Sequence, residues 1–174
     1  MAHSDTWKRK RERAEHTLNA FLKNRLPFLH AGMRALRLCV RKQLWRREVT
    51  NRLRRNQPLT NRSHLPVLLS VLGLRGEGAE VGVLNGYFSE LILMYSDLSV
   101  LHSIDPWHEF DGSYDDKHNA LQCEQDERHA FTCKRLAPYG ERSRIHRMTS
   151  REAAPAFADG SLDFVYIICI PTNA

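Results

Sequence analysis

Apolar residues recur with two different periods along this chain, and the change of period divides it in two. From residue 6 to about residue 56 the period is helical, because apolar residues spaced four and three apart fall on one stripe of a helix (Leu22, Leu26, Leu29, Met33, Leu36 and Val40). Pro27 interrupts this stripe, and proline is tolerated in a first helical turn but not in a helix interior. The sequence therefore predicts one helix that ends near Arg25 and a second that runs from about Pro27 to about Asn56.

After residue 66, short apolar runs alternate with helical segments. The runs predict four strands: Ala79–Val83, Val100–Ile104, Arg144–Met148 and Leu162–Ile168. The segments predict four helices: Val67–Leu74, Tyr87–Ser96, Lys117–Leu136 and Arg151–Phe157, the last capped by Ser150. This β-α-β order predicts an α/β fold with a Rossmann-like parallel sheet. Two prolines and several turn-forming residues in the segment 57–66 mark the boundary, so we expect a helical extension over residues 1–63 and a sheet domain over residues 64–174.

Charge separates the same two regions, although the net charge is only +6. Residues 1–66 carry +13, whereas residues 67–174 carry −7. Runs of like charge are usually solvated faces, so we expect the basic helices to pack their apolar stripe on the domain and leave their arginines in water. The alternative is a basic surface for an anionic partner, either lipid or nucleic acid. Nucleic acid is the less favoured of the two, because no aromatic residues alternate with the basic ones.

Composition also constrains the compartment. No stretch approaches the length of uncharged apolar sequence that a membrane-spanning helix needs, and the chain starts without an apolar signal region. The four cysteines form no C-x-x-C pair and no metal-ligand spacing. These features favour a cytoplasmic, reducing setting.

The candidate chemistry lies where the first two expected strands end. Glu80 lies near the end of the first strand, Gly82 and Gly86 bracket a tight turn before the next helix, and Asp105 ends the second strand. Glycine allows a left-handed backbone or a close approach to a ligand, and the first turn of a helix offers unpaired N–H groups. An acid at the tip of the second strand can accept hydrogen bonds from both ribose hydroxyls. The combination predicts a nucleoside cofactor site.

The glycine spacing decides between two classes of cofactor. A dinucleotide fingerprint would place glycine at positions 82, 84 and 87, but Leu84 and Tyr87 occupy two of them. The E-x-G-x-x-x-G pattern from Glu80 to Gly86 instead resembles the first motif of class I S-adenosylmethionine-dependent methyltransferases, and Asp105 matches the acid at the end of their second strand. The resemblance covers roughly residues 64 to 167. Further segments resemble a small-molecule branch of the family: Tyr114-Asp115, Asn119, Gln122, Glu124, 140–143, 150–154 and 161–167.

The resemblance implies S-adenosyl-L-methionine as cofactor and gives several residues a role. Glu80 would hold the methionine part, Gly82 and Gly86 would let the loop pass beneath it, and Asp105 would bind the ribose. The remaining implied contacts are Asn85 and Tyr87 in the loop, Pro106 and Trp107 beside the adenine, and Thr149 and Ser150 at the adenine edge. Tyr114 would lie at the pocket entrance or pack the helix that follows it. No catalytic residue is identified, and the segment 108–118 matches no metal signature, so we expect no metal.

The end of the chain departs from the family pattern. Relatives place an aspartate and then a histidine after the fourth strand, whereas here Ile167 is followed by Ile-Cys-Ile-Pro-Thr-Asn-Ala. We therefore expect a shortened methyltransferase that retains the first four of seven strands. The fourth strand would lie beside the first and leave an apolar edge over residues 164–170, open to aggregation or to pairing with another copy.

Three functions follow from these expectations. The first is a methyltransferase that acts on a small-molecule acceptor. The second is a non-catalytic half-domain that serves as an interaction module through its basic helices. The third is a different Rossmann-like nucleotide enzyme, which the glycine spacing disfavours.

Overall fold

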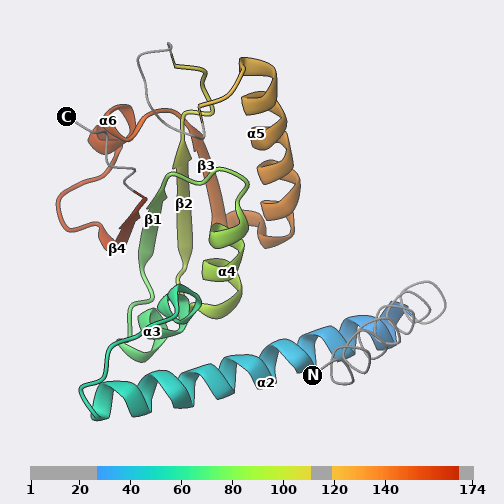
Figure 1. Cartoon of the computed structure of the whole chain (residues 1–174), viewed down its shortest axis with the longest axis vertical. Helices are drawn as coiled ribbons and strands as arrows, with labels where there is room; N and C mark the ends of the chain where they lie inside the picture. The colour runs from blue at the N-terminus through green and yellow to red at the C-terminus, as the bar shows by residue number, and fades with distance from the viewer. Residues whose placement is uncertain (1–26, 111–118, 169–174) are drawn as a thin grey trace, which may run out of the picture. The chain divides into compact units, whose positions relative to one another are not determined.

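A computed structural model describes the backbone of residues 27–110 and 119–168 and the side chains of residues 31–110 and 119–168. The chain divides into two compact units, residues 1–45 and residues 46–174. The second unit is built on a four-stranded, all-parallel sheet in the order β3-β2-β1-β4 (Figure 1). The strands are β1 (Glu77–Val81), β2 (Val100–Asp105), β3 (Ser143–Arg147) and β4 (Leu162–Ile167). The predicted α/β, Rossmann-like arrangement is confirmed, and β4 lies beside β1 as expected.

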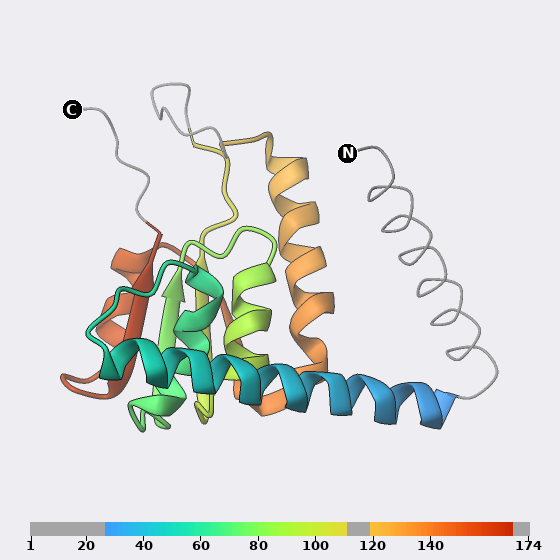
Figure 2. The ribbon, with the colours of Figure 1, turned by 60° about the horizontal axis from the view of Figure 1, so that its bottom comes forward.

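Helices cover both faces of this sheet (Figure 2). One face carries α3 (Leu65–Val71), α4 (Tyr87–Tyr95) and α5 (Gln122–Leu136). The other face carries α6 (Ser150–Ala153) and the 3₁₀ helix η3 (Ala154–Ala156). Two further 3₁₀ helices, η1 (Arg62–His64) and η2 (Ala137–Arg142), precede α3 and follow α5.

The larger core lies on the α4 side of the sheet. Its buried members come from α3, α4, α5, β2 and the turn before β2 (Leu69, Phe88, Ile92, Leu93, Leu98, Leu101 and Leu136). Phe164 and Tyr166 of β4 pack against them, and the rings of Phe88 and Tyr166 lie 4.8 Å apart. Full burial of one large apolar side chain contributes about 1.5–3 kcal/mol, so this cluster fixes α3, α4 and α5 on the sheet.

The opposite face is covered less completely. Ala79, Ile104 and Ala153 form its buried cluster. In β4, Phe164 and Tyr166 face the larger core, and Val165 and Ile167 alternate with them. Val165 and Ile167 therefore face the α6 side, where they remain exposed. Among the described residues β4 pairs only with β1, so its outer edge is open. This arrangement agrees with the apolar edge expected from the sequence.

Helix α2 (Pro27–Arg54) is one continuous helix of 28 residues. Pro27 is the first described residue, so the predicted start of the helix is not tested, and the helix ends two residues before Asn56, whose backbone is left-handed (φ +51°). The helix expected to end near Arg25 lies outside the described residues. The last turns of α2 belong to the second unit, where Val49 is fully buried and Arg52 donates a hydrogen bond to the Pro58 carbonyl (3.1 Å). Within the described part of the chain, no helix is long and apolar enough to cross a bilayer.

Some predicted boundaries shift for local reasons. β1 ends at Val81 rather than Val83, because Gly82 turns the chain with φ +87°. The start of α5 predicted at Lys117 lies outside the described residues, and residues 119–121 are not helical. Instead, the Asn119 side chain accepts from the Phe110 N–H and donates to the Phe110 carbonyl, both at 3.0 Å.

The predicted cap of the last helix is wrong. Thr149, not Ser150, is the N-cap of α6 and forms a capping box with Glu152. The Thr149 hydroxyl accepts from the Glu152 N–H (3.2 Å), and the Glu152 carboxylate accepts from the Thr149 N–H (2.8 Å). The helix is also shorter than predicted, because Pro155 has no N–H to continue the α-helical ladder and the chain tightens into η3.

Candidate functional site

The candidate site lies where the parallel strands end at their carboxyl edge. The chain steps outward from β1 to β2 to β3 and then returns to pair β4 with the other side of β1. Ligands of open α/β sheets bind at such a reversal of strand order, outside the carboxyl ends of the strands. The residues predicted for the cofactor lie in the last residues of β1 and β2 and on the segments that follow β1, β2 and β3 at this edge.

The loop between β1 and α4 has an unusual backbone. Gly82, Leu84 and Gly86 have φ values of +87°, +57° and +68°. A left-handed conformation costs a non-glycine residue such as Leu84 roughly 1–2 kcal/mol, so neighbouring contacts must hold it. A Cβ on Gly86 would lie 3.0 Å from the Thr132 methyl carbon, and one on Gly82 would lie 3.3 Å from Ile168 Cβ. Both glycines are therefore required by the packing of the loop.

Asp105 holds this loop in place. One oxygen of its carboxylate accepts the N–H groups of Val83 (2.8 Å) and Leu84 (2.9 Å). The other accepts the N–H of Trp107 (2.9 Å). An ionised carboxylate has about four acceptor positions, so three are used within the protein and one remains. Both ribose hydroxyls were expected to bind Asp105, but the structure leaves it room for a single further hydrogen bond.

Trp107 lies inside the protein rather than on an open surface. Its indole N–H donates to the Leu84 carbonyl (2.8 Å), which also accepts from the Thr132 hydroxyl (3.2 Å). Its ring lies 4.8 Å from the His129 ring. The fully buried side chain of Trp107 therefore connects the β1–α4 loop with helix α5.

Glu80, the penultimate residue of β1, is fully buried. One carboxyl oxygen accepts a 2.5 Å hydrogen bond from the Ser89 hydroxyl on α4. The other oxygen has no hydrogen-bond partner among the described residues. Burial raises the pKa of Glu80 to about 7, against the opposing effects of the Ser89 hydrogen bond and the Arg62 charge. The side chain is a buried acid with an unsatisfied acceptor, which is costly unless a donor or cation reaches it.

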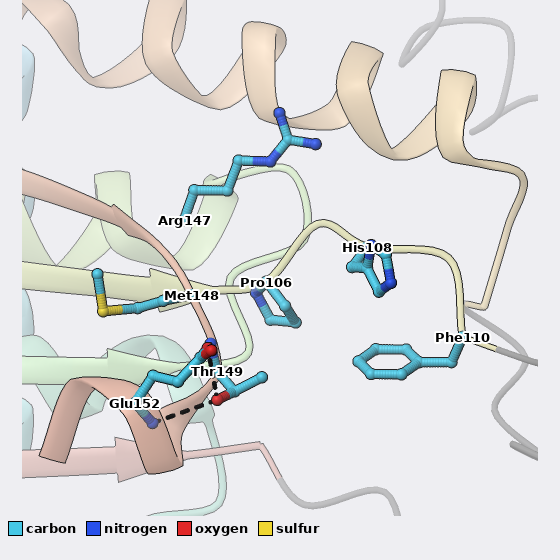
Figure 3. Close-up of a pocket in the computed structure, with 7 residues that line it drawn as sticks. All are labelled: Pro106, His108, Phe110, Arg147, Met148, Thr149 and Glu152. Atoms are coloured by element: carbon cyan, nitrogen blue, oxygen red, sulfur yellow. Dashed lines mark hydrogen bonds between the residues drawn. The ribbon is translucent and has the colours of Figure 1, made fainter.

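A cavity of about 280 Å³ opens at the carboxyl ends of β2 and β3 (Figure 3). It lies between the segment that follows β2 and the end of β3 with the start of α6 (Pro106, His108, Phe110, Arg147, Met148, Thr149 and Glu152). The Phe110 ring reaches from the first segment toward Thr149 on the second. The capping hydrogen bonds from Thr149 lower the pKa of Glu152, so Glu152 brings a negative charge to the cavity at neutral pH.

Arg147 closes one side of the cavity. Its guanidinium donates to the Trp107 carbonyl (3.0 Å) and pairs with Asp126 of α5. The Trp107 carbonyl also accepts from the Gln122 amide (3.1 Å). These contacts connect β3, α5 and the segment after β2 around a single carbonyl group.

The ten predicted cofactor residues thus fall into three groups. The first group is the β1–α4 loop, with Gly82, Asn85 and Gly86, together with Asp105 and Trp107, which form hydrogen bonds to it. Glu80, fully buried near the end of β1, belongs to the same group. Pro106 and Thr149 line the cavity, whereas Ser150 is exposed and does not. Tyr87 is also exposed and stacks under the Arg135 guanidinium (3.8 Å), beside Phe131 on α5. Tyr114 lies outside the described residues.

Several supporting residues carry no sequence signal that pointed to the site. Ser89, Thr132 and His129 lie on α4 and α5, and nothing in the spacing of these helices indicates that they contact Glu80, the loop and Trp107, respectively. Phe110 and Arg147 likewise reach the cavity only through the pairing of β2 with β3. In contrast, the Thr149-x-x-Glu152 pattern is a capping-box signature that is visible in the sequence.

A second polar cluster lies on the α6 face of the sheet. His102 of β2 joins Glu77 of β1 (2.8 Å) to His146 of β3 (2.9 Å), and Phe157 meets the His102 ring edge-on. Burial, followed by the neighbouring His102, lowers the pKa of His146. The cluster ties three strands together, and the described residues contain no group of His, Cys, Asp or Glu side chains suited to hold a metal ion.

Comparison with known proteins does not place this chain in a family: no family model matches it, and neither the curated proteins nor the solved structures give a significant match.

Proposed function

We propose that this chain binds S-adenosyl-L-methionine in the manner of a class I methyltransferase and by descent methylates a small-molecule acceptor. The observation that carries the proposal is Glu80, a buried carboxyl group with one unpartnered oxygen directly before the glycine loop. The amino group of the cofactor's methionine part is cationic. A carboxylate that receives it gains a charge-assisted hydrogen bond in a site from which water is excluded.

The other described residues fit the rest of the cofactor. The left-handed backbone at Gly82 and Gly86 is the conformation in which a loop can turn tightly and pass close to a ligand at the carboxyl end of β1. Asp105 can accept one ribose hydroxyl with its remaining acceptor position. Pro106 and Phe110 offer apolar surface for the adenine in the cavity, whose 280 Å³ lies just below the usual range for small-molecule pockets.

When bound, the cofactor supplies the methyl group, and methyl transfer from a sulfonium needs mainly proximity and in-line orientation. We assign only binding and positioning roles to the described residues. Glu80 and Asp105 would orient the cofactor, and Trp107 and Arg147 would hold the segments on which it rests. We assign no base for the acceptor.

A second candidate function is a non-catalytic interaction module. The open edge of β4, with Val165 and Ile167 exposed, favours it, because an unpaired apolar strand can add a strand from another copy. The basic helix α2 would supply a second contact surface in such a module. A dinucleotide enzyme is not favoured, because Leu84 and Tyr87 replace two glycines of that fingerprint.

Titration calorimetry of the whole chain separates these functions. We expect heat of binding with S-adenosylmethionine and none with NAD. We expect Glu80→Gln to weaken binding of S-adenosylmethionine by about 10- to 100-fold, because a charge-assisted hydrogen bond is worth about 1.5–3 kcal/mol. Glu77→Gln is the matched control, since Glu77 also lies on β1 but bonds to His102 on the other face, and it should change the affinity little. Binding of NAD alone would favour a dinucleotide enzyme, and binding of neither compound would favour the interaction module.

A further inference from the structure

Helix α2 exposes a stripe of apolar side chains in the segment 31–45. Leu36, Val40 and Leu44 are 65%, 49% and 57% exposed. They are spaced four residues apart, so they lie one above another on a single side of the helix. An apolar stripe that is exposed to water indicates a surface that binds a partner.

The same segment is strongly basic. No acidic residue occurs from Pro27 to Arg47 of this helix. Arg34, Arg37 and Arg41 are spaced three and four apart, which forms a second stripe beside the apolar one. Arginine can lay its aliphatic stem along an apolar surface while its guanidinium reaches outward to phosphate.

We propose that this face of α2 binds the surface of an anionic lipid bilayer, with the apolar stripe among the acyl chains and the arginines at the headgroups. A basic amphipathic helix with one apolar stripe is the form that lies in a membrane interface. The charge complements anionic phospholipids, and the helix is not apolar enough to cross the membrane. The inference uses no residue of the cofactor site, so it does not depend on the proposed function.

Lipid fits both stripes, whereas nucleic acid fits only one. Phosphate groups of a duplex would engage the arginines, but the three exposed aliphatic side chains would add nothing to such a contact. A second copy of α2 could cover the apolar stripe, but it would also bring the flanking arginines of two helices together. The bilayer surface is the partner that accommodates exposed aliphatic groups and positive charge at once.

Vesicle flotation of the full chain tests this inference. We expect the chain to float with phosphatidylcholine vesicles that contain roughly one-third phosphatidylserine, to bind pure phosphatidylcholine far more weakly, and to dissociate as salt is raised. Leu36→Gln with Leu44→Gln should weaken binding to the anionic vesicles by about 10-fold or more. Arg34→Gln with Arg41→Gln should weaken it by roughly 5-fold for each charge removed.

The control is a double change on the opposite side of the same helix. Ala31 and Ala35 are exposed and lie away from the apolar stripe, so Ala31→Gln with Ala35→Gln should bind like the parent. Circular dichroism of each variant checks that the helix is retained. The inference would be overturned by no binding of the parent to anionic vesicles, by equal binding of the leucine double variant, or by binding of duplex RNA in place of vesicles. A shift from dimer to monomer in the leucine variant, without vesicle binding, would identify a second copy as the partner and would also overturn it.

Discussion

Replacement of Asp105 by alanine is expected to lower the free energy of unfolding by about 3–5 kcal/mol, whereas the same change at Asp163 should cost less than about 1 kcal/mol. The two aspartates make similar contacts. Asp163 accepts the N–H groups of Arg75 (3.0 Å) and Gly76 (2.7 Å), and Asp105 accepts those of Val83, Leu84 and Trp107. The difference lies mainly in burial, because the contacts of Asp163 are exposed and those of Asp105 are partly buried.

Burial decides the cost because water can replace an exposed acceptor but not a buried one. Without Asp105, the left-handed backbone at Leu84 also loses the hydrogen bond of its N–H, one of the contacts that hold it. Urea unfolding followed by circular dichroism gives both values from the midpoint and slope of each transition. Equal losses in the two variants would mean that the Asp105 carboxylate does not anchor the β1–α4 loop.

The second large effect is a change of stability with pH that depends on Glu80. Burial raises the pKa of Glu80 to about 7 in the folded protein, from an ordinary value of 4.5. The folded protein therefore holds this proton more tightly than the unfolded chain does. The stabilisation is complete below about pH 4.5 and is lost as the pH rises through about 7. A shift of this size corresponds to about 3 kcal/mol.

Comparison of the parent with Glu80→Gln isolates this effect. Other groups also titrate in this range, including His129 and His146, whose pKa values burial lowers. Their contributions are common to both proteins, so they cancel in the difference. We expect the unfolding free energy of the parent, relative to that of Glu80→Gln, to fall by about 2–3 kcal/mol between pH 5 and pH 8. A difference that stays constant with pH would contradict a raised pKa at Glu80.

The sequence predicted the elements of the sheet domain because their signals are local. Apolar residues dominate β4, several also occur in β2, and α4 follows a turn former, Gly86. The positions of Glu80 at the end of β1 and Asp105 at the end of β2 follow from the same runs. Parallel order then places both residues at one edge of the sheet.

The contacts within the site could not be predicted in this way. The hydrogen bond from Ser89 to Glu80, the burial of Trp107 against α5, and the His102–His146 pair all depend on how helices and strands pack in three dimensions. Asp105 was predicted to bind the ribose or, as an aspartate before proline, to begin a local turn; its contacts with the N–H groups of Val83 and Leu84 were not predicted, because those residues lie 22 and 21 positions away in the chain. A carboxylate at the end of a strand accepts hydrogen bonds from the N–H groups that tertiary packing places beside it, and a sequence pattern does not show which groups these are.

Proton release on cofactor binding tests the central claim, which is that the buried carboxyl group of Glu80 receives the amino group of S-adenosylmethionine. Calorimetric titrations at pH 6 in two buffers of different ionisation enthalpy measure this release. Glu80 is mostly protonated at that pH, and a bound ammonium group stabilises the carboxylate, so the parent should release close to one proton on binding. Glu80→Gln should bind more weakly and release none. Equal affinity and equal proton release in the two proteins, or no binding by the parent, would contradict the claim.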